Sequence, residues 1–382
     1  MEENLQENSR DLNSAMQIKC PGCGGTMVYS PTTQSLQCIY CGTTKELPTS
    51  RGEVQENDYA LWSQTSRSDR MLGIMDLSAE GGQQEAVLQE AVQVRCEQCG
   101  ATVQIDSTRS SAICPYCGTP LMLEKSQVKR FWQPNYLLPF TVDKKECSEL
   151  FQKWLNGKWF LPSKYKNGNV LEEKFQGVYY PYWAYGAHTS TKYEGERGTN
   201  RTVTKKGSDG KNVDETVTDW KRVSGKVVRD FKNVLVPASK SLPEDVVADH
   251  RRWPVGEIVE YTPEYTAGFS TEVYTVDFTE GMDTAKTQME VQIESDIRKD
   301  IGGDKQRIKH KDVDYSDLVF KLVLLPLWVS AFTIKGKTYQ FIINGRTGEL
   351  HGDYPLDKMK VALVVIAVIA VIVLFYYLLK LQ

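Results

Sequence analysis

The chain has 382 residues, with 46 lysines and arginines against 49 aspartates and glutamates, so its formal net charge is -3. This balance excludes a strongly basic protein, and no overall field attracts the chain to nucleic acid. Charged residues make up 25% and hydrophobic residues 41% of the sequence, which are ordinary globular values and argue against overall disorder. A single hydrophobic core seldom serves a chain of this length, so several domains are predicted.

The N-terminal third is predicted to contain two small metal-binding domains. Residues 1–17 are polar and acidic, without the features of a signal peptide, and are predicted to be a disordered N-terminus. Zinc ribbons are predicted at residues 18–45 and 93–122. A linker at residues 46–92 separates them, and it is rich in glutamine, serine and glycine, with scattered apolar residues that can dock elsewhere.

The ribbons are predicted from eight of the nine cysteines, which form two copies of the spacing Cys-x2-Cys-x14-Cys-x2-Cys. Each Cys-x2-Cys knuckle turns tightly enough to direct two thiolates at one ion, and a glycine follows its second cysteine. Four thiolates close a tetrahedron around structural zinc and leave no open position for catalysis. We therefore predict two structural zinc ions, bound by Cys20, Cys23, Cys38 and Cys41 and by Cys96, Cys99, Cys114 and Cys117.

Disulfide formation and iron binding are the alternative uses of these cysteines. Disulfides need an oxidising compartment, and the lack of a recognisable signal peptide argues against one. Iron can occupy the same kind of site and stays open as an alternative to zinc. The ninth cysteine, Cys147, shares a predicted helical face with Phe151 and Leu155, which indicates a buried thiol rather than a nucleophile.

The ribbons carry few charges. No lysine, arginine, aspartate or glutamate lies between Cys20 and Cys41, and the second ribbon is slightly acidic, whereas phosphate binding needs clustered cations. The ribbon hairpins instead offer apolar side chains suited to protein contact. We predict that a protein partner, rather than nucleic acid, docks on Met27, Tyr29, Ile39, Tyr40 and Tyr116.

Residues 127–357 are predicted to form an α+β body with a mostly antiparallel, β-rich sheet and a few helices. Two segments, Val178–Trp183 and Val323–Trp328, share the pattern Val-x-x-Pro-x-Trp and are predicted to be equivalent strands. Their prolines favour a sheet edge or a bulge. A long polar hairpin is predicted over residues 202–218, and Gly195–Gly198 is predicted to be a turn.

Further elements are predicted towards the C-terminal end of the body. A hairpin follows Lys337–Asn344, with Asn344-Gly345 in its turn. A shorter helix is predicted around residues 243–252. An amphipathic helix that ends at Gly302 is predicted from apolar residues recurring at every fourth position: Ala285, Met289, Ile293, Ile297 and Ile301.

No enzymatic activity is predicted. The sequence contains no phosphate loop, dinucleotide fingerprint, zinc-protease motif or nucleophile elbow, so neither an enzyme nor a small-molecule substrate is expected. An unrecognised active site within the aromatic body stays open as a further alternative.

The chain ends in a predicted transmembrane helix at residues 361–379. These nineteen residues are all apolar, which a mean hydropathy of -0.41 for the whole chain conceals. As a helix they span about 28 Å, close to the roughly 30 Å hydrocarbon core of a bilayer. Lys358 and Lys360 precede the run, so we predict a single-pass, tail-anchored protein of the cell membrane with its N-terminal body in the cytoplasm.

These features together resemble a bacterial family of membrane-anchored double zinc-ribbon proteins, labelled as TFIIB-type zinc ribbon or primosomal helicase-like proteins. The resemblance covers most of residues 18–380. Besides the cysteine knuckles, it is carried by Tyr180–Trp183, Leu235–Lys240, Tyr261–Tyr265, Leu325–Trp328 and Asn344–Gly348. No helicase motif is present, so that label does not transfer.

The resemblance implies a membrane scaffold that recruits phage-shock-type or flotillin-type (SPFH) proteins during envelope stress. Together with the sequence features described above, the resemblance predicts a non-enzymatic, membrane-anchored adaptor whose ribbons and body bind protein partners. A membrane-tethered nucleic-acid-binding protein is the alternative.

Overall fold

The fold is mixed α+β, with most of its regular secondary structure in β-sheets and few helices, which confirms the predicted fold class. The predicted disordered N-terminus at 1–17 and the predicted helix at 243–252 lie outside the described residues. The computed structural model describes residues 18–47, 54–64, 88–105, 112–121, 127–165, 175–206, 212–242, 253–334 and 337–380.

The described strands form a three-stranded sheet and a twelve-stranded sheet. The smaller sheet contains β1 (Met27–Ser30), β2 (Ser35–Cys38) and β3 (Thr44–Glu46). The larger sheet contains β4 (Asn57–Asp58), β5 (Leu88–Arg95), β6 (Thr102–Ile105), β7 (Gln127–Trp132), β8 (Tyr136–Leu137), β9 (Gln176–Lys206), β10 (Asn212–Pro237), β11 (Val259–Glu260), β12 (Ser270–Glu272), β13 (Lys305–Ile334), β14 (Lys337–Asn344) and β15 (Leu350–Gly352).

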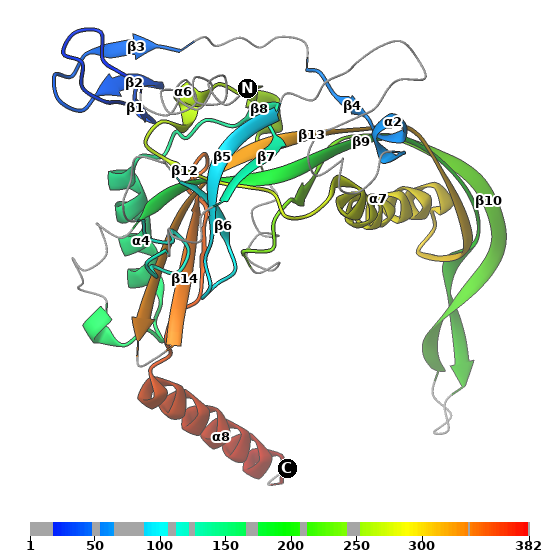
Figure 1. The fold of residues 1–382 in the computed structure, drawn as a ribbon. Coiled ribbons are helices and arrows are strands. Elements are labelled where there is room, and N and C mark those ends of the chain that lie inside the picture. The colour runs from blue at the N-terminus through cyan, green and yellow to red at the C-terminus, as the bar shows by residue number, and fades with distance from the viewer. Residues whose placement is uncertain are drawn as a thin grey trace.

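The α-helices are α2 (Tyr59–Ser63), α4 (Lys144–Gly157), α6 (Pro263–Thr266), α7 (Phe278–Ile301) and α8 (Lys358–Lys380), and short 3-10 helices occur at Ser163–Tyr165 and Val255–Glu257. Helices α2, α4, α6 and α7 lie beside these sheets, and α8 extends away from them (Figure 1).

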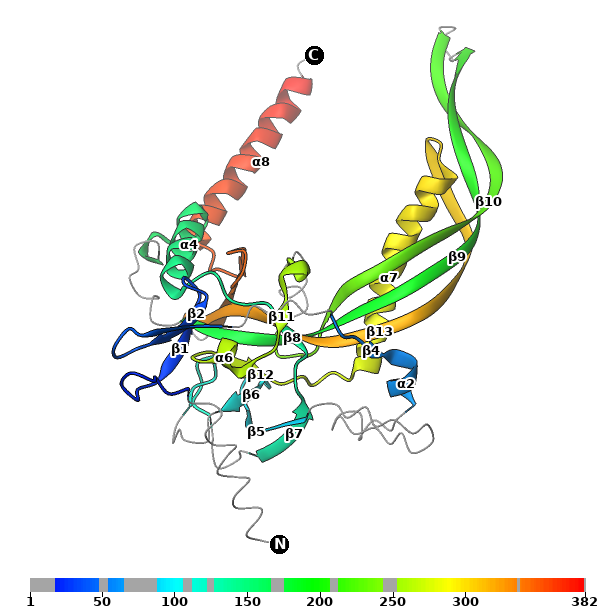
Figure 2. The ribbon, with the colours of Figure 1, turned by 90° about the horizontal axis from the view of Figure 1, so that it is seen from above.

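Three long strands dominate the larger sheet: β9 pairs antiparallel with β10 on one side and with β13 on the other. Their inner ends belong to the compact part of the molecule, which we call the body. Their outer ends curve away from it as an arm made of residues 188–206, 212–231 and 305–316 (Figure 1). The predicted polar hairpin is the end of this arm. The arm and helix α8 project to the same side of the body (Figures 1 and 2).

Helix α7 lies against the arm and confirms the predicted amphipathic helix. It begins at Asp277, whose side chain accepts a hydrogen bond of 2.8 Å from the backbone N–H of Thr279. It ends at Gly302, whose φ of 66° provides the predicted glycine cap. The face towards the arm is buried and contains the predicted residues Ala285, Met289, Ile293, Ile297 and Ile301.

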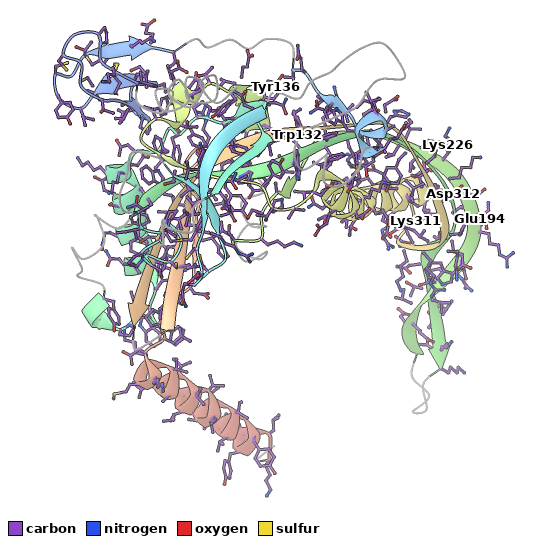
Figure 3. The ribbon with its side chains drawn as sticks, viewed as in Figure 1. Trp132, Tyr136, Glu194, Lys226, Lys311 and Asp312 are labelled. Carbon is purple, nitrogen blue, oxygen red and sulfur yellow. The ribbon has the colours of Figure 1, made fainter. Side chains whose placement is uncertain are left out.

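Ion pairs join α7 to the arm. The Lys311 ammonium lies 2.8 Å from a carboxylate oxygen of Glu290 and 2.9 Å from one of Glu294. Arg229 on β10 pairs with Asp296 at 2.5 Å. Figure 3 shows Lys311 on the arm beside α7. The helix and the three strands therefore form one layered unit.

Gly195–Gly198 is not a turn, which corrects the prediction, because both glycines lie inside β9. Gly195 pairs with Val223 on one side and with Ile308 on the other. A Cβ atom at Gly195 would lie 2.6 Å from the carbonyl oxygen of Arg307 and 2.9 Å from Ile301. The glycine lets the strands and α7 approach closely, and this reason is invisible to local sequence patterns.

The two Val-x-x-Pro-x-Trp segments lie side by side, because Val178–Trp183 of β9 pairs antiparallel with the matching part of β13. The prolines favoured a sheet edge or a bulge, but neither segment lies at an edge or at a register shift. Pro181 lies where the neighbour of β9 changes from β12 to β10, and Pro326 lies where the neighbour of β13 changes from β8 to β14. On that side of its strand each proline occupies a gap in the pairing, where its missing N–H costs no ladder hydrogen bond, while the other side keeps the β9–β13 pairing.

The predicted hairpin after Lys337–Asn344 is confirmed by the pairing of β14 with β15, but its turn differs. The positive φ falls on Gly348, at 74°, and not on Gly345. Asn344 instead accepts hydrogen bonds on its side-chain oxygen from the backbone N–H groups of Arg346 and Thr347, at 2.8 and 3.0 Å. The turn is therefore closed by an asparagine side chain.

Part of the predicted linker packs into the body. β4 pairs with β13, and Trp62 of α2 is buried 4.6 Å from Trp132, between ring centroids. Trp132, labelled in Figure 3, belongs to an aromatic cluster in which Phe278 and Phe320 stack at 4.2 Å. Aromatic burial on this scale holds the linker segment to the root of the arm.

Helix α4 buries Cys147 completely, on the same face as Phe151 and Leu155. Burial raises the pKa of its thiol well above the usual range, because the charged form loses water. A protonated thiol without solvent access confirms the interpretation as a buried core residue.

Candidate metal centres and docking surface

The eight predicted ligands come together as two tetrads, and within each tetrad the four sulfur atoms lie within 4.8 Å of one another. In the first ribbon the Sγ atoms of Cys20 and Cys41 are 3.5 Å apart, as are those of Cys23 and Cys38. The second ribbon repeats both distances.

These distances fit a metal ion better than a disulfide. Tetrahedral zinc with bonds of about 2.3 Å places its sulfur ligands roughly 3.8 Å apart, whereas a disulfide brings two sulfurs to about 2.05 Å. All eight thiols are free in the structure. Each tetrad can hold one metal ion, consistent with zinc, and the choice of zinc over iron stays a prediction.

The backbone builds all four knuckles in the same way. The residue after each second cysteine is a glycine, and its N–H donates to the carbonyl oxygen of the first cysteine at 2.8 to 3.1 Å. These glycines have φ between 72° and 78°, a region that other residues rarely adopt. The predicted role of glycine in the turn is thereby confirmed for Gly24, Gly42, Gly100 and Gly118.

Hydrogen bonds and burial lower the pKa of some cysteines in each tetrad and raise the pKa of others. The hydroxyl of Thr43, 3.1 Å from the sulfur, lowers the pKa of Cys41 to about 6. The hydrogen bond from Cys114 lowers the pKa of Cys99 to about 5. Thiolate is the form that binds metal, so Cys41 and Cys99 favour ligation at neutral pH. By contrast, Cys23, Cys96 and Cys114 have raised pKa values and must lose a proton when an ion binds.

The predicted docking residues divide into two groups. Ile39 and Tyr40, between Cys38 and Cys41, are 59% and 73% exposed. Met27 and Tyr29 are buried, which corrects the expectation that the hairpin exposes them. Their face of the first ribbon packs on the body.

Tyr29 shows how the first ribbon is attached. Its hydroxyl donates to the carbonyl oxygen of Phe140 at 3.1 Å, and its ring lies 5.4 Å from that of Tyr265. The backbone N–H of Tyr29 also donates to the carbonyl oxygen of Ala267 at 2.9 Å. These partners are more than one hundred residues away in sequence, so hairpin periodicity alone could not reveal them.

The second ribbon is joined to the body through its backbone. β6 pairs with β5 and with β12, and β5 also pairs with β7. β6 thus pairs outside the ribbon, and Ile113 forms a single bridge with Pro120. The ribbon core and the body core are therefore continuous.

Tyr116 is completely buried between these two parts, which corrects its prediction as an exposed docking residue. It lies inside the last knuckle, and its hydroxyl donates to the carboxylate of Glu272 on β12. Glu272 also accepts from the hydroxyls of Ser239 at 2.5 Å and Ser241 at 2.8 Å. Sequence reasoning missed Glu272, because a single glutamate in a short strand carries no local signal.

Burial of Glu272 raises the pKa of its carboxyl group to about 7. The folded chain then keeps a proton that the unfolded chain releases near pH 4.5, so the free energy of unfolding should fall as pH rises from 4.5 to 7. The change amounts to about 3 kcal/mol. Glu272→Gln, which retains a hydrogen-bonding amide, should remove this slope in chemical denaturation of the full chain.

Glu260→Gln provides the control for this measurement, because Glu260 is an exposed carboxylate on the nearby strand β11. This variant should keep the pH slope of the unmodified chain. An equal slope in the Glu272→Gln variant would contradict the assignment to Glu272.

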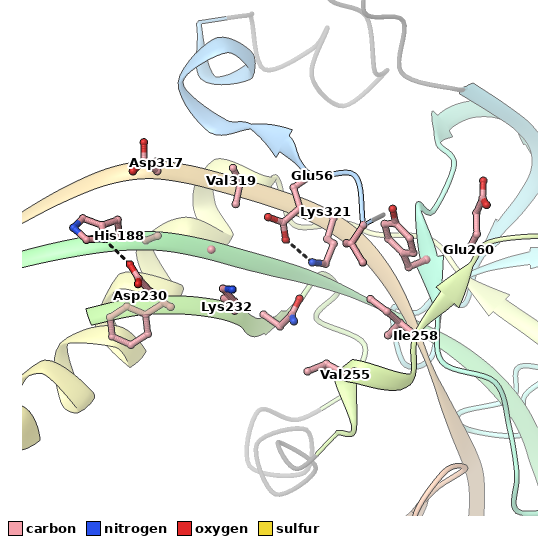
Figure 4. Close-up of a pocket in the computed structure, with 17 residues that line it drawn as sticks. Glu56, His188, Asp230, Lys232, Val255, Ile258, Glu260, Asp317, Val319 and Lys321 are labelled. Carbon is pink, nitrogen blue, oxygen red and sulfur yellow. Dashed lines mark hydrogen bonds and ion pairs between the residues drawn. The ribbon is translucent and has the colours of Figure 1, made fainter. Parts of the chain in front are cut away.

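A cleft of about 630 Å³ lies at the root of the arm (Figure 4). Both neighbours of β9 bulge here, with positive φ at Asn233 and Asp317. Two ion pairs lie in the cleft: buried Lys321 lies 2.5 Å from Glu56, and His188 lies 2.5 Å from Asp230 (Figure 4). Lys232, Glu260 and Asp317 also line it. No sequence motif pointed to this cleft, because residues from distant segments form it.

Helix α8 is long and apolar enough to cross a membrane. It has 23 residues, its most apolar stretch has a mean hydropathy of 3.1, and none of that stretch is buried against the rest of the chain. A core helix of a soluble domain buries at least one of its faces against neighbouring elements, whereas α8 exposes apolar side chains on all sides.

The chain is similar to the uncharacterized protein YdjG of Bacillus subtilis (strain 168), with 23% identity over 345 residues. The alignment covers 90% of this chain and 91% of that protein, so the likeness is not confined to the ribbons. No family model and no solved structure matches the chain. The relative has no assigned function and supplies none here.

Proposed function

We propose that this protein is a non-enzymatic, membrane-anchored adaptor whose first ribbon binds a protein partner. The main support for this proposal is the exposure of Ile39 and Tyr40. Both residues lie within a knuckle between two metal ligands, so metal binding holds them in a rigid turn. A tyrosine beside an aliphatic residue on a rigid, exposed turn is the composition of a protein-contact anchor.

The charge of the ribbon favours a protein over nucleic acid as this partner. The segment from Cys20 to Cys41 contains no charged residue, whereas binding to phosphates depends on lysine and arginine. The four-thiolate sites also leave no open coordination position. A structural role for the metals in presenting a contact surface agrees with both features.

Helix α8 is proposed to anchor the adaptor in the cell membrane. Lys358 and Lys360 precede the apolar stretch, which supports a cytoplasmic body by the positive-inside rule. Eight free thiols in metal-binding geometry support the same reducing compartment. The family resemblance adds that the partner is a phage-shock-type or flotillin-type protein acting in envelope stress.

The adaptor proposal predicts a partner that depends on the exposed knuckle. The full chain with Ile39→Ser and Tyr40→Ser should be purified from detergent-solubilised membranes beside the unmodified chain. We expect the bound partner to decrease by about tenfold or more, since truncating central apolar anchors costs at least about 1.4 kcal/mol. The metal content should not change.

Val291→Ser is the matched control, because Val291 is an exposed apolar residue on α7, far from the ribbon in sequence. It should leave the partner bound. Equal recovery with all three chains would contradict docking on the ribbon. Loss of the partner after nuclease treatment would favour the nucleic-acid alternative.

A further inference from the structure

A loop of the body lies at the beginning of helix α8. The loop, Lys158–Leu161, follows helix α4 and is about two hundred residues from α8 in sequence. The backbone N–H of Asp357 donates to the carbonyl oxygen of Phe160 at 2.8 Å. This bond joins the loop to the residue that precedes α8.

Lys360 strengthens the attachment from within the first turn of α8. Its ammonium donates to the carbonyl oxygens of Trp159 at 3.1 Å and of Leu161 at 2.9 Å. Hydrogen bonds from a charged donor are the stronger kind. The loop is therefore attached to the first turn of α8. The position of that turn determines the position of the loop.

Exposed apolar side chains gather at this level of the molecule. Trp159 is 57% exposed, and so is Leu356, while Met359 is 76% exposed. Single exposed apolar residues are common on proteins, but these three surround the start of a helix that is itself apolar all round. Exposure of these apolar side chains to water is energetically unfavourable.

Cations accompany the apolar residues. Lys158 lies with its ammonium 4.5 Å from the ring centre of Trp154 and 5.4 Å from that of Tyr354, and Lys358 is exposed on α8. Aromatic rings and lysines side by side are typical of the zone where lipid headgroups meet acyl chains.

The other end of α8 carries a second aromatic group, Tyr376 and Tyr377, both exposed. At about 1.5 Å per residue, these tyrosines lie roughly 24 to 26 Å along the helix from Lys360. That separation is close to the thickness of the hydrocarbon core, about 30 Å. Aromatic side chains thus mark both ends of the span.

We propose that the Lys158–Leu161 loop is a second membrane contact, in which Trp159 inserts into the headgroup interface of the bilayer that α8 crosses. Lys158 and Lys358 pair there with anionic headgroups. The loop then fixes the body against the membrane surface instead of letting it swing on α8. This inference rests on the anchoring role of α8 in the proposed function.

The test uses the full chain in vesicles of phosphatidylcholine and phosphatidylglycerol that contain lipids brominated near the headgroup end of the acyl chain. Bromine quenches nearby tryptophan emission, and we expect clear quenching of the unmodified protein. Trp159→Phe should lower the quenched fraction by about half or more, because Trp159 is the exposed tryptophan of this region, whereas Trp154 packs against Phe341 and Tyr354. Trp253→Phe, which removes a buried tryptophan, should keep the quenching.

Flotation of the same vesicles separates the two proposals. Both variants should float with the lipid, because α8 is unchanged. Failure of the unmodified chain to float would contradict anchoring by α8. Flotation with the same quenching in the Trp159→Phe variant would overturn the loop contact alone, and so would quenching seen only with bromine at the end of the acyl chain.

Discussion

Replacing Cys96 and Cys99 together by serine is expected to remove one of two metal ions per chain and to unfold more than the second ribbon. Metal binding to a four-thiolate site contributes about 10–16 kcal/mol to folding at neutral pH. β6 of this ribbon pairs with β12, and Tyr116 inside its last knuckle hydrogen-bonds to Glu272. Loss of the ion should therefore expose amides of β5, β6 and β12.

Cys20→Ser with Cys23→Ser is the matched comparison, because it removes two ligands at the equivalent positions of the first ribbon. This ribbon forms its own three-stranded sheet, separate from the larger sheet, and Tyr29 attaches it to the body through its side chain and its backbone N–H. The variant should also lose one ion, while β5, β6 and β12 keep their protection from hydrogen exchange.

Metal analysis and hydrogen exchange on the purified full chain would measure both effects. Two ions retained in either double variant would show that the ligand assignment is wrong. Equal loss of protection in both variants would show that the coupling does not run through β6 and Tyr116. Iron found in place of zinc would correct the metal but leave the ligands unchanged.

Arginines in the middle of α8 are expected to abolish stable membrane insertion. Ile366 and Ile369 lie within the apolar stretch and are exposed. Each arginine at the centre of a span costs about 2.5 to 3.5 kcal/mol in insertion, so Ile366→Arg with Ile369→Arg should reduce the inserted fraction by several orders of magnitude. The chain should then be extracted from membranes by alkaline carbonate.

Ile366→Leu with Ile369→Leu is the control, since it keeps the apolar character of the helix and should resist extraction as the unmodified chain does. Membrane retention of the arginine variant would contradict anchoring by α8. Metal content should be the same in all these chains, because the ribbons do not contact the mutated residues.

Much of the metal chemistry could be predicted because it depends on short-range geometry. A knuckle brings two thiolates together within four residues, and the glycine after it supplies the positive φ that the turn needs. The helix ending at Gly302 and the apolar helix α8 follow from periodicity and composition in the same way. These features need no knowledge of distant partners.

Side-chain exposure could not be predicted, because it depends on what packs against each surface. Met27 and Tyr116 are apolar or aromatic residues in short hairpins or turns, as Ile39 and Tyr40 are, yet only the last two remain exposed. The proline segments show the same limit. Their prolines are compatible with central strands only because the neighbouring strands change at those residues.

The sequence by itself determined the two cysteine tetrads, the apolar C-terminal helix and the α+β class, since spacing, hydropathy and period are local properties of the chain. Only the tertiary structure decided that the second ribbon is built into the body sheet, that Tyr116 and Glu272 join them, and that Trp159 lies at the start of α8. Residues as far as 201 positions apart form these contacts, and only long-range strand pairing and packing bring them together.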